Sequence, residues 1–187
     1  DYYECYEKEW TKEVKIILCG AHSTGKTTVA NLLAEEMKLS RRESVSRKSP
    51  HQPGTPENQR YIMSKVYEEN VSSLYNGYVL ERSVFDVDAY TKLYDLRMLY
   101  SYDAMKMDTA ARIFKSNDDY ILFYFPITFG LVADGVRPED EAKQKEVDLF
   151  LKYNLDSRKV NYHTVPTGSP ETRVRYIKRK MKKYATV

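Results

Sequence analysis

Eight consecutive residues near the start of the chain have the types and spacing of a phosphate-binding loop. Residues 20–27 read Gly-Ala-His-Ser-Thr-Gly-Lys-Thr and fit the pattern G-x-x-x-x-G-K-[ST]. The two glycines let the backbone curl so that successive N–H groups point at phosphate oxygens. A helix that begins near Lys26 adds the positive end of its dipole. Lys26 is expected to reach the terminal phosphates and the Thr27 hydroxyl to ligate Mg²⁺, so the predicted cofactors are ATP and Mg²⁺.

The segments on either side of this loop have the pattern that it requires. Residues 14–19 form a β-branched run typical of a buried strand, and Val29, Leu33 and Met37 then recur at helical spacing. His22 occupies a free position of the motif, and we interpret it as a spacer. The predicted nucleotide contacts are Gly20, Ala21, His22, Ser23, Thr24, Gly25, Lys26, Thr27 and Thr28.

Strand and helix patterns alternate along the rest of the chain. Apolar runs at 78–81, 120–125 and 161–165 predict strands, and a further strand is placed near 44–46. Helices are predicted from Thr55-Pro56, over 85–100 and 103–115, from about 141 to 153, and from Ser169-Pro170. This alternation predicts an α/β fold, with about five parallel strands covered by helices on both faces. Residues 1–13 are aperiodic and are interpreted as a leader or a peripheral segment.

Composition narrows the class of protein. The 187 residues are enough for one domain over 1–187, and the net charge of +3 does not by itself indicate nucleic-acid binding. Two cysteines cannot stabilise a fold of this size through disulfide bonds, which predicts a reducing, cytoplasmic location. The sequence also has no apolar span of 18 residues that would suggest a membrane helix. The chain has no N-K-x-D tetrapeptide of the kind that specifies guanine in GTPases, and it leaves little room for the added domains of motor ATPases.

Three later motifs resemble those of known kinases. Glu81-Arg82-Ser83 ends a predicted strand and resembles the deoxynucleoside kinases, which carry Glu-Arg-Ser at this place. The segments 85–90 and 133–141, which contain Asp86, Ala89-Tyr90 and Asp134-Gly135-Val136-Arg137, are similar to the P-loop group that contains the ribosylnicotinamide kinases. The resemblance implies a single P-loop kinase domain with a short lid at 131–141.

The resemblance also implies roles for individual residues. Arg137 in the lid would close over the phosphates and stabilise charge on the transferred group. Arg82 would hold a phosphate near the site of transfer, and Glu81 would orient Arg82 or the Mg²⁺ shell. The related kinases end their second strand in an acidic residue that helps to activate the acceptor hydroxyl, whereas this chain has no clear counterpart. Asp86 and Glu43 are the candidate bases, and a base elsewhere in the chain, or none, is the remaining alternative.

Two basic segments bear on what is phosphorylated: the loop 41–48 and the final helix 173–183. A phosphate-bearing acceptor or a polynucleotide would explain them, and so would solvent-exposed lysines that keep a helix soluble. Their cationic residues are Arg41, Arg42, Arg47, Lys48, Arg173, Arg175, Lys178, Arg179, Lys180, Lys182 and Lys183.

Three functions follow as alternatives. The first is ATP-dependent phosphoryl transfer to a hydroxyl or phosphate of a small nucleoside- or nucleotide-like molecule. The second is a polynucleotide kinase that acts on DNA at a 5′ end or on a hydroxymethylated base such as 5-hydroxymethyluracil, with the 17 tyrosines available to stack bases. The third is a nucleotide-gated ATPase or regulator. No membrane contact is expected, and the chain could form a homodimer.

Overall fold

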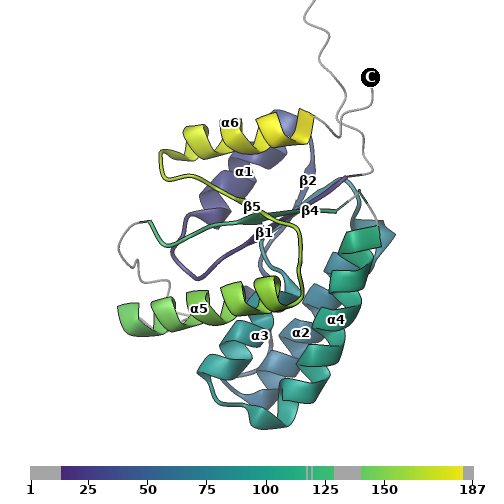
Figure 1. The fold of residues 1–187 in the computed structure, drawn as a ribbon, viewed down its shortest axis with the longest axis vertical. Helices are drawn as coiled ribbons and strands as arrows, with labels where there is room; N and C mark the ends of the chain where they lie inside the picture. Colours follow the sequence, from purple (N-terminus) through teal and green to yellow (C-terminus); the bar gives the residue numbers. More distant parts are fainter. Residues whose placement is uncertain (1–13, 117, 119, 129–139, 183–187) are drawn as a thin grey trace, which may run out of the picture.

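A parallel five-stranded sheet forms the centre of the structure, a computed structural model that describes residues 14–116, 118, 120–128 and 140–182 (Figure 1). The strands lie in the order β2–β3–β1–β4–β5, and every neighbouring pair is parallel. Their bounds are β1 (Lys15–Cys19), β2 (Ser40–Arg42), β3 (Tyr78–Leu80), β4 (Tyr120–Tyr124) and β5 (His163–Thr164). This arrangement confirms the predicted α/β fold.

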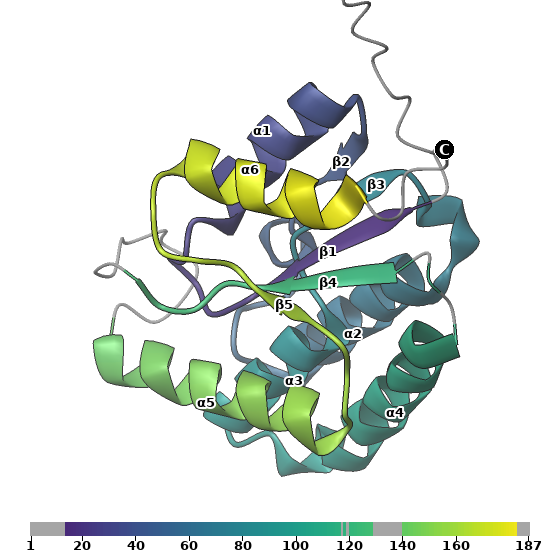
Figure 2. The same ribbon diagram turned by 45° about the horizontal axis from the view of Figure 1, so that its top comes forward.

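Helices cover both faces of the sheet. Two of them lie side by side on one face, α1 (Lys26–Met37) and α6 (Pro170–Met181), as Figure 2 shows. The helices on the other face are α2 (Pro56–Val71), α3 (Val84–Leu93), α4 (Tyr100–Ser116) and α5 (Glu141–Ser157). Each face of the sheet therefore buries its own hydrophobic cluster, which is why the central strands β1 and β4 are apolar along most of their length.

The centre of the sheet determines where a ligand can bind. Strand β1 lies between β3 and β4, with Ile16 paired to both Val79 and Ile121, and the chain crosses from one side of β1 to the other between β3 and β4. In such sheets the loops that leave the carboxyl ends of the strands separate at this point and form a crevice. The segments that follow β1, β3 and β4 are the phosphate loop, residues 81–83 and residues 125–128.

The predicted helix starts at proline are confirmed. The Thr55 side chain accepts a hydrogen bond from the Asn58 N–H at 3.3 Å, and Pro56 is the first residue of α2. Ser169 caps α6 in the same way, through the Thr172 N–H at 3.2 Å. A side-chain acceptor followed by proline is a local signal, so the sequence alone reveals it.

Several element boundaries differ from the prediction. The second strand is Ser40–Arg42, an edge strand paired with β3, whereas residues 45–47 form the 3₁₀ helix η1 (Val45–Arg47). The position of β2 at the edge of the sheet explains why its bounds were not predicted, because a three-residue edge strand with polar side chains has no apolar pattern. The predicted helix 85–100 is interrupted after α3, where Asp95 adopts a positive φ of 52°, and the 3₁₀ helix η3 (Arg97–Leu99) leads into α4.

One face of α2 packs into the core, whereas the apolar residue just beyond the end of the helix does not. Leu74 is 79% exposed and lies in the 3₁₀ helix η2 (Ser73–Tyr75) beyond the end of α2, while Ile62, Met63 and Val66 form the buried stripe. The fifth strand covers only two residues, and α5 continues to Ser157.

Residues 1–13 and the lid up to residue 139 lie outside the described part of the chain. None of the helices in the described ranges is long and apolar enough to cross a membrane.

Candidate active site

The phosphate loop joins β1 to α1 in a conformation that depends on glycine. Gly20 has φ of +152°, and a Cβ atom at this position would lie 2.6 Å from the carbonyl oxygen of Phe125. Gly25, at the N-terminus of α1, has φ of 85°. The loop therefore packs against the segment after β4 so closely that a side chain at position 20 has no room.

The ammonium group of Lys26 lies inside the curl of this loop. Its Nζ donates hydrogen bonds to the carbonyl oxygen of Gly20 at 2.7 Å and to Thr24 Oγ1 at 3.0 Å. The residue is only 6% exposed. Ala21 and Thr24 are also buried, whereas Thr28 faces solvent on the first turn of α1. The structure thus places Lys26 at the centre of the predicted nucleotide contacts.

Thr27 and Glu81 form the second part of the site. Thr27 Oγ1 donates a hydrogen bond to Glu81 Oε2 at 2.6 Å, and the other carboxylate oxygen, Oε1, accepts one from Arg41 Nε at 3.0 Å. The sequence places Arg41 in a basic loop, and no local pattern connects it with Glu81. A hydroxyl and a carboxylate are the oxygen ligands that Mg²⁺ prefers, and Mg²⁺ takes few of them because phosphates and water complete its shell. The pair therefore offers two of the oxygen ligands that the predicted cation would need.

Asp86 lies at the centre of the site and is fully buried. Its Oδ1 accepts a hydrogen bond from the Gly20 N–H at 2.7 Å, and its Oδ2 accepts one from the Ser83 N–H at 2.8 Å and another from the Ser83 hydroxyl. Ser83 in turn caps α3, so the two residues form a capping box. These contacts join the start of α3 to the phosphate loop and occupy both oxygens of the carboxylate.

The other candidate base, Glu43, lies on the surface. Its carboxylate is ion-paired with Lys48 at 3.1 Å, and both side chains are exposed. The hydrogen bond from Lys48 lowers the pKa of Glu43. These contacts favour a surface ion pair over a proton acceptor.

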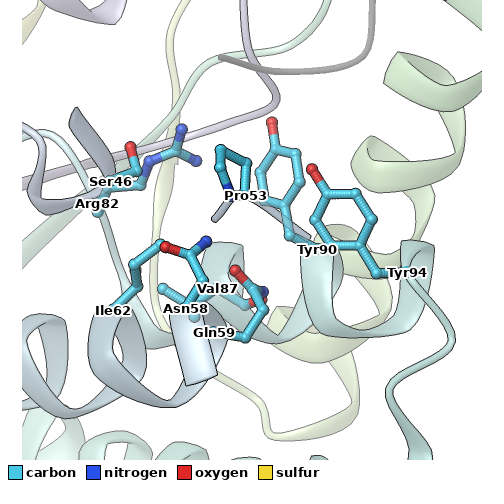
Figure 3. A pocket seen from close by; sticks show the side chains of 9 residues that line it. All are labelled: Ser46, Pro53, Asn58, Gln59, Ile62, Arg82, Val87, Tyr90 and Tyr94. Carbon is cyan, nitrogen blue, oxygen red and sulfur yellow. The ribbon is translucent and has the colours of Figure 1, made fainter. Parts of the chain in front are cut away.

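A pocket opens beside the phosphate loop (Figure 3). Its walls come from the loop after η1, from α2, and from the chain that runs from the end of β3 into α3. In the figure Tyr90 and Tyr94 lie side by side along one wall, and the guanidinium group of Arg82 points into the space from another. The lining residues are Ser46, Pro53, Asn58, Gln59, Ile62, Arg82, Val87, Tyr90 and Tyr94.

Two polar atoms in this pocket are buried and have no hydrogen-bond partner among the described residues. One is Nη1 of Arg82, whose side chain is 6% exposed, and the other is Oδ1 of Asn58. The Arg82 guanidinium lies 5.2 Å from the centre of the Tyr90 ring. Buried polar atoms are nearly always hydrogen-bonded, so these two indicate where a polar ligand would bind.

Tyr90 connects this pocket to the phosphate loop. Its hydroxyl oxygen accepts a hydrogen bond from the His22 backbone N–H at 3.2 Å and lies 2.8 Å from His22 Nδ1. The carbonyl oxygen of His22 accepts a further bond from Gln144 Nε2 of α5 at 2.7 Å. His22, which occupies a free position of the motif, is thus buried and bonded to two helices. Nothing local in the sequence could reveal this, although Tyr90 belongs to the Ala-Tyr pair of the resemblance.

The predicted basic surfaces are smaller than the sequence suggests. Arg41 is paired with Glu81, Arg42 with Glu69 at 2.8 Å, and Lys48 with Glu43, so the loop 41–48 is largely neutralised. Arg173 is 4% exposed and points inward. Its guanidinium donates to the carbonyl oxygen of Thr24 at 2.8 Å and to the Thr128 hydroxyl at 2.6 Å. Arg173 therefore supports the phosphate loop and is not part of the basic face of α6.

The basic residues that do face outward on α6 surround a shallow hollow. It is lined by Pro166, Thr172, Arg175, Tyr176, Lys178, Arg179 and Lys182. Lys178 also pairs with Glu36 of α1 at 2.8 Å. Arg137, the predicted lid arginine, lies outside the described residues.

A parallel sheet in the order β2–β3–β1–β4–β5, with a phosphate loop between β1 and α1, is a P-loop α/β fold of the kind that the motifs predicted. A family model described as "AAA domain" matches residues 15–173, and the chain belongs to this family. A comparison with curated proteins finds no match.

The solved structures to which the chain is similar share its fold at low sequence identity. NadR protein in complex with NR has a TM-score of 0.69 at 16% identity, over 94% of this chain and 51% of that one. The chain thus spans about half the length of NadR. Deoxyadenosine kinase from M. mycoides has a TM-score of 0.62 at 14% identity, over 91% of this chain and 100% of that one. Shikimate kinase from Acinetobacter baumannii has a TM-score of 0.57 at 16% identity, over 93% and 96%.

Proposed function

We propose that the protein is an ATP- and Mg²⁺-dependent kinase that transfers the γ-phosphate to a small nucleoside- or nucleotide-like acceptor. The observation that carries this proposal is the position of Arg82. Its buried Nη1 atom faces a pocket, and the wall of that pocket is hydrogen-bonded to the phosphate loop through Tyr90. A hydrogen-bond donor placed between the nucleotide site and the acceptor pocket would lie where the γ-phosphoryl group passes from one to the other.

The pocket suits a planar acceptor with polar edges. Tyr90 and Tyr94 offer an aromatic wall, with ring centres 6.4 Å apart, and Asn58 and Gln59 offer amide groups from α2. Gln59 Nε2 already donates to the carbonyl oxygen of Val87 at 3.2 Å, so Asn58 is the amide with free capacity. Nucleosides, nucleotides and related ribosides present such a ring together with a hydroxyl or a phosphate for Arg82.

In the mechanism that follows, the chain binds and orients both reactants. The loop N–H groups and Lys26 hold the triphosphate, and Arg82 orients the group on the acceptor that receives the phosphoryl group. Glu81 keeps the Thr27 hydroxyl in place for the cation. Mg²⁺, when bound, neutralises charge that develops on the phosphate oxygens. Arg137 is proposed, from the resemblance alone, to close over the γ-phosphoryl group and exclude water.

The structure gives no support to Glu43 as a base, and we assign Asp86 a positioning role. Phosphoryl transfer depends mainly on position and charge, so a strong base is not required. With both oxygens bonded to Gly20 and Ser83, Asp86 fixes the loop relative to α3.

A second candidate is a polynucleotide kinase, because the hollow on α6 presents Arg175, Arg179 and Lys182 around Tyr176. Cationic side chains around an aromatic ring are typical of single-strand binding. Replacing these three residues by glutamine should reduce the slope of affinity against salt concentration if the hollow binds an oligonucleotide. The same variant should leave transfer to a small acceptor unchanged under the first proposal.

Both candidates are tested by transfer of labelled γ-phosphate from ATP to a mixed panel of acceptors. The panel contains nucleosides, nucleoside monophosphates, ribosyl nicotinamide, and oligonucleotides with and without hydroxymethylated bases. Label on a small molecule supports the first candidate and identifies its substrate. Label on oligonucleotides alone supports the second, and label in free phosphate alone favours a nucleotide-gated ATPase.

A further inference from the structure

The residue at position 22 of the phosphate loop is clamped by side chains from two helices. Its N–H and its ring are both held by the Tyr90 hydroxyl of α3, and its carbonyl oxygen is held by Gln144 of α5. A phosphate loop functions by directing its N–H groups inward at phosphate oxygens. In this chain the N–H group of His22 is bonded to the Tyr90 side chain instead, so the conformation at position 22 depends on Tyr90.

The Tyr90 hydroxyl makes two contacts with His22. Its oxygen accepts the backbone N–H at 3.2 Å and lies 2.8 Å from Nδ1, a distance at which the hydroxyl donates to Nδ1 or accepts from it, according to the tautomer of the ring. Both residues are almost fully buried, with 6% of Tyr90 and 2% of His22 exposed. A buried pair of this kind is well ordered, because breaking it would leave polar atoms without partners.

The other side of Tyr90 faces the acceptor pocket. Its ring lines the pocket and lies under the Arg82 guanidinium at 5.2 Å (Figure 3). A molecule in the pocket would therefore contact the same side chain whose hydroxyl holds the loop.

We propose that Tyr90 is a positioning residue that holds the phosphate loop in its nucleotide-binding shape from the wall of the acceptor pocket, with His22 as its partner. The proposal rests on the proposed function, because it assumes that the loop binds ATP. It adds a role for two residues that contact neither the transferred phosphoryl group nor the cation. It also gives a physical route by which the acceptor pocket and the nucleotide site influence each other.

The test is a double-mutant cycle on the affinity for Mg·AMP-PNP, measured by isothermal titration without any acceptor. Tyr90→Phe removes the hydroxyl and keeps the ring, and His22→Ala removes the partner. Each variant is expected to bind Mg·AMP-PNP about threefold to tenfold more weakly, which is the usual effect of one hydrogen bond. The double variant is expected to match Tyr90→Phe within about twofold, because Tyr90→Phe already removes the ring contact that His22→Ala removes, together with the hydrogen bond from the backbone N–H.

Two controls separate positioning from loss of stability. Tyr120→Phe also removes a tyrosine hydrogen bond, from Tyr120 Oη to the carbonyl oxygen of Val71 at 3.1 Å, at the amino-terminal ends of the strands and so away from the phosphate loop. It should leave the affinity unchanged. His22→Asn keeps a hydrogen-bonding atom near the position of Nδ1 and should recover most of the loss seen in His22→Ala. If Tyr90→Phe does not fold, the comparison of His22→Ala with His22→Asn carries the test.

Several results would overturn the proposal. They are wild-type affinity in Tyr90→Phe or in His22→Ala, losses that multiply in the double variant, an equal loss in Tyr120→Phe, and no recovery in His22→Asn. If the wild-type protein binds no Mg·AMP-PNP at all, the proposed function fails together with this inference. If it binds and the variants bind equally well, only the inference fails.

Discussion

The backbone N–H of Gly20 and the carboxylate of Asp86 are joined by a hydrogen bond of 2.7 Å. This bond connects the start of the phosphate loop to the first turn of α3, and the second oxygen of the same carboxylate holds the N-cap residue Ser83. Asp86 is therefore the residue through which the strand end that carries Glu81 and Arg82 is held against the nucleotide loop.

Asp86→Asn should weaken nucleotide binding as well as stability. An amide has one oxygen, so its NH₂ group must face either the Gly20 N–H or the Ser83 donors, and one hydrogen bond is lost. We expect the free energy of unfolding to fall by about 1–3 kcal/mol and the affinity for Mg·AMP-PNP to fall about tenfold.

Asp88→Asn is the matched control, since Asp88 is also a buried carboxylate of α3 but is bonded to Lys92 and Asn154. It should reduce stability and leave nucleotide affinity intact. If Asp86→Asn kept full nucleotide affinity and lost only the transfer step, Asp86 would be the catalytic base and the positioning role would be wrong.

Glu81→Gln should raise the Mg²⁺ concentration that transfer requires. The amide oxygen can still accept the hydrogen bond from the Thr27 hydroxyl, but the negative charge that the carboxylate would offer to the cation is lost. We expect the Mg²⁺ concentration at half-maximal rate to rise about threefold or more, because one charge in a buried site contributes on the order of 1 kcal/mol. Glu69→Gln, which breaks the neighbouring pair with Arg42, should not change it. An unchanged Mg²⁺ requirement in Glu81→Gln would separate Glu81 from the cation site.

Arg82→Lys should lower the rate of transfer far more than the affinity for nucleotide. Lysine keeps the positive charge but loses the planar group whose Nη1 faces the pocket. Removing a donor of this kind from an active site typically costs about a hundredfold in rate. Rates at saturating ATP and acceptor, together with Mg·AMP-PNP titration, measure the two effects. A loss of stability with normal turnover would reduce Arg82 to a structural role.

Asp103 predicts a pH dependence of stability that has no connection with catalysis. Its side chain is fully buried in α4, and burial raises the pKa of its carboxyl group to about 7. Between about pH 4 and pH 7 the folded protein therefore holds a proton that the unfolded chain has released. Because the folded state binds more protons, the free energy of unfolding falls as the pH rises through this range, by up to about 1.4 kcal/mol per pH unit from this group.

Asp103→Asn should remove this contribution, so the variant gains stability over the wild-type protein as the pH rises from about 4 to 7. Chemical denaturation at several pH values measures the difference. Asp95→Asn, on the exposed turn after α3, should run parallel to the wild-type curve. A constant difference between Asp103→Asn and wild type would show that Asp103 is ionised throughout.

The features that the sequence predicted well depend on neighbouring residues. The phosphate loop is one contiguous segment, and the geometry of its backbone determines where the glycines and Lys26 must stand. The helix caps at Thr55 and Ser169 likewise bond to residues within four positions in the sequence. The buried strands β1 and β4 stand out because both of their faces are covered. Such local rules do not need the fold to be known.

The features that the sequence did not predict depend on the direction in which a side chain points and on partners that are distant along the chain. Arg41 and Arg173 count as basic residues in any sequence window, yet one is paired with Glu81 and the other points into the phosphate loop. Gln144 and His22 are 122 residues apart, and only the packing of α5 beside α3 brings them together. Charge in a sequence does not show which way a side chain points, and this is why the basic surfaces were overestimated.

The central claim is that the γ-phosphate of ATP is transferred to a small molecule bound next to the phosphate loop. Its most direct test is the ratio between labelled phosphate on a small acceptor and ATP consumed, with the wild-type protein and Lys26→Ala assayed side by side. The account predicts a ratio near one for the wild-type protein and no acceptor-dependent consumption for Lys26→Ala. A ratio near zero with every nucleoside, nucleotide and riboside, while ATP is still hydrolysed, would contradict it.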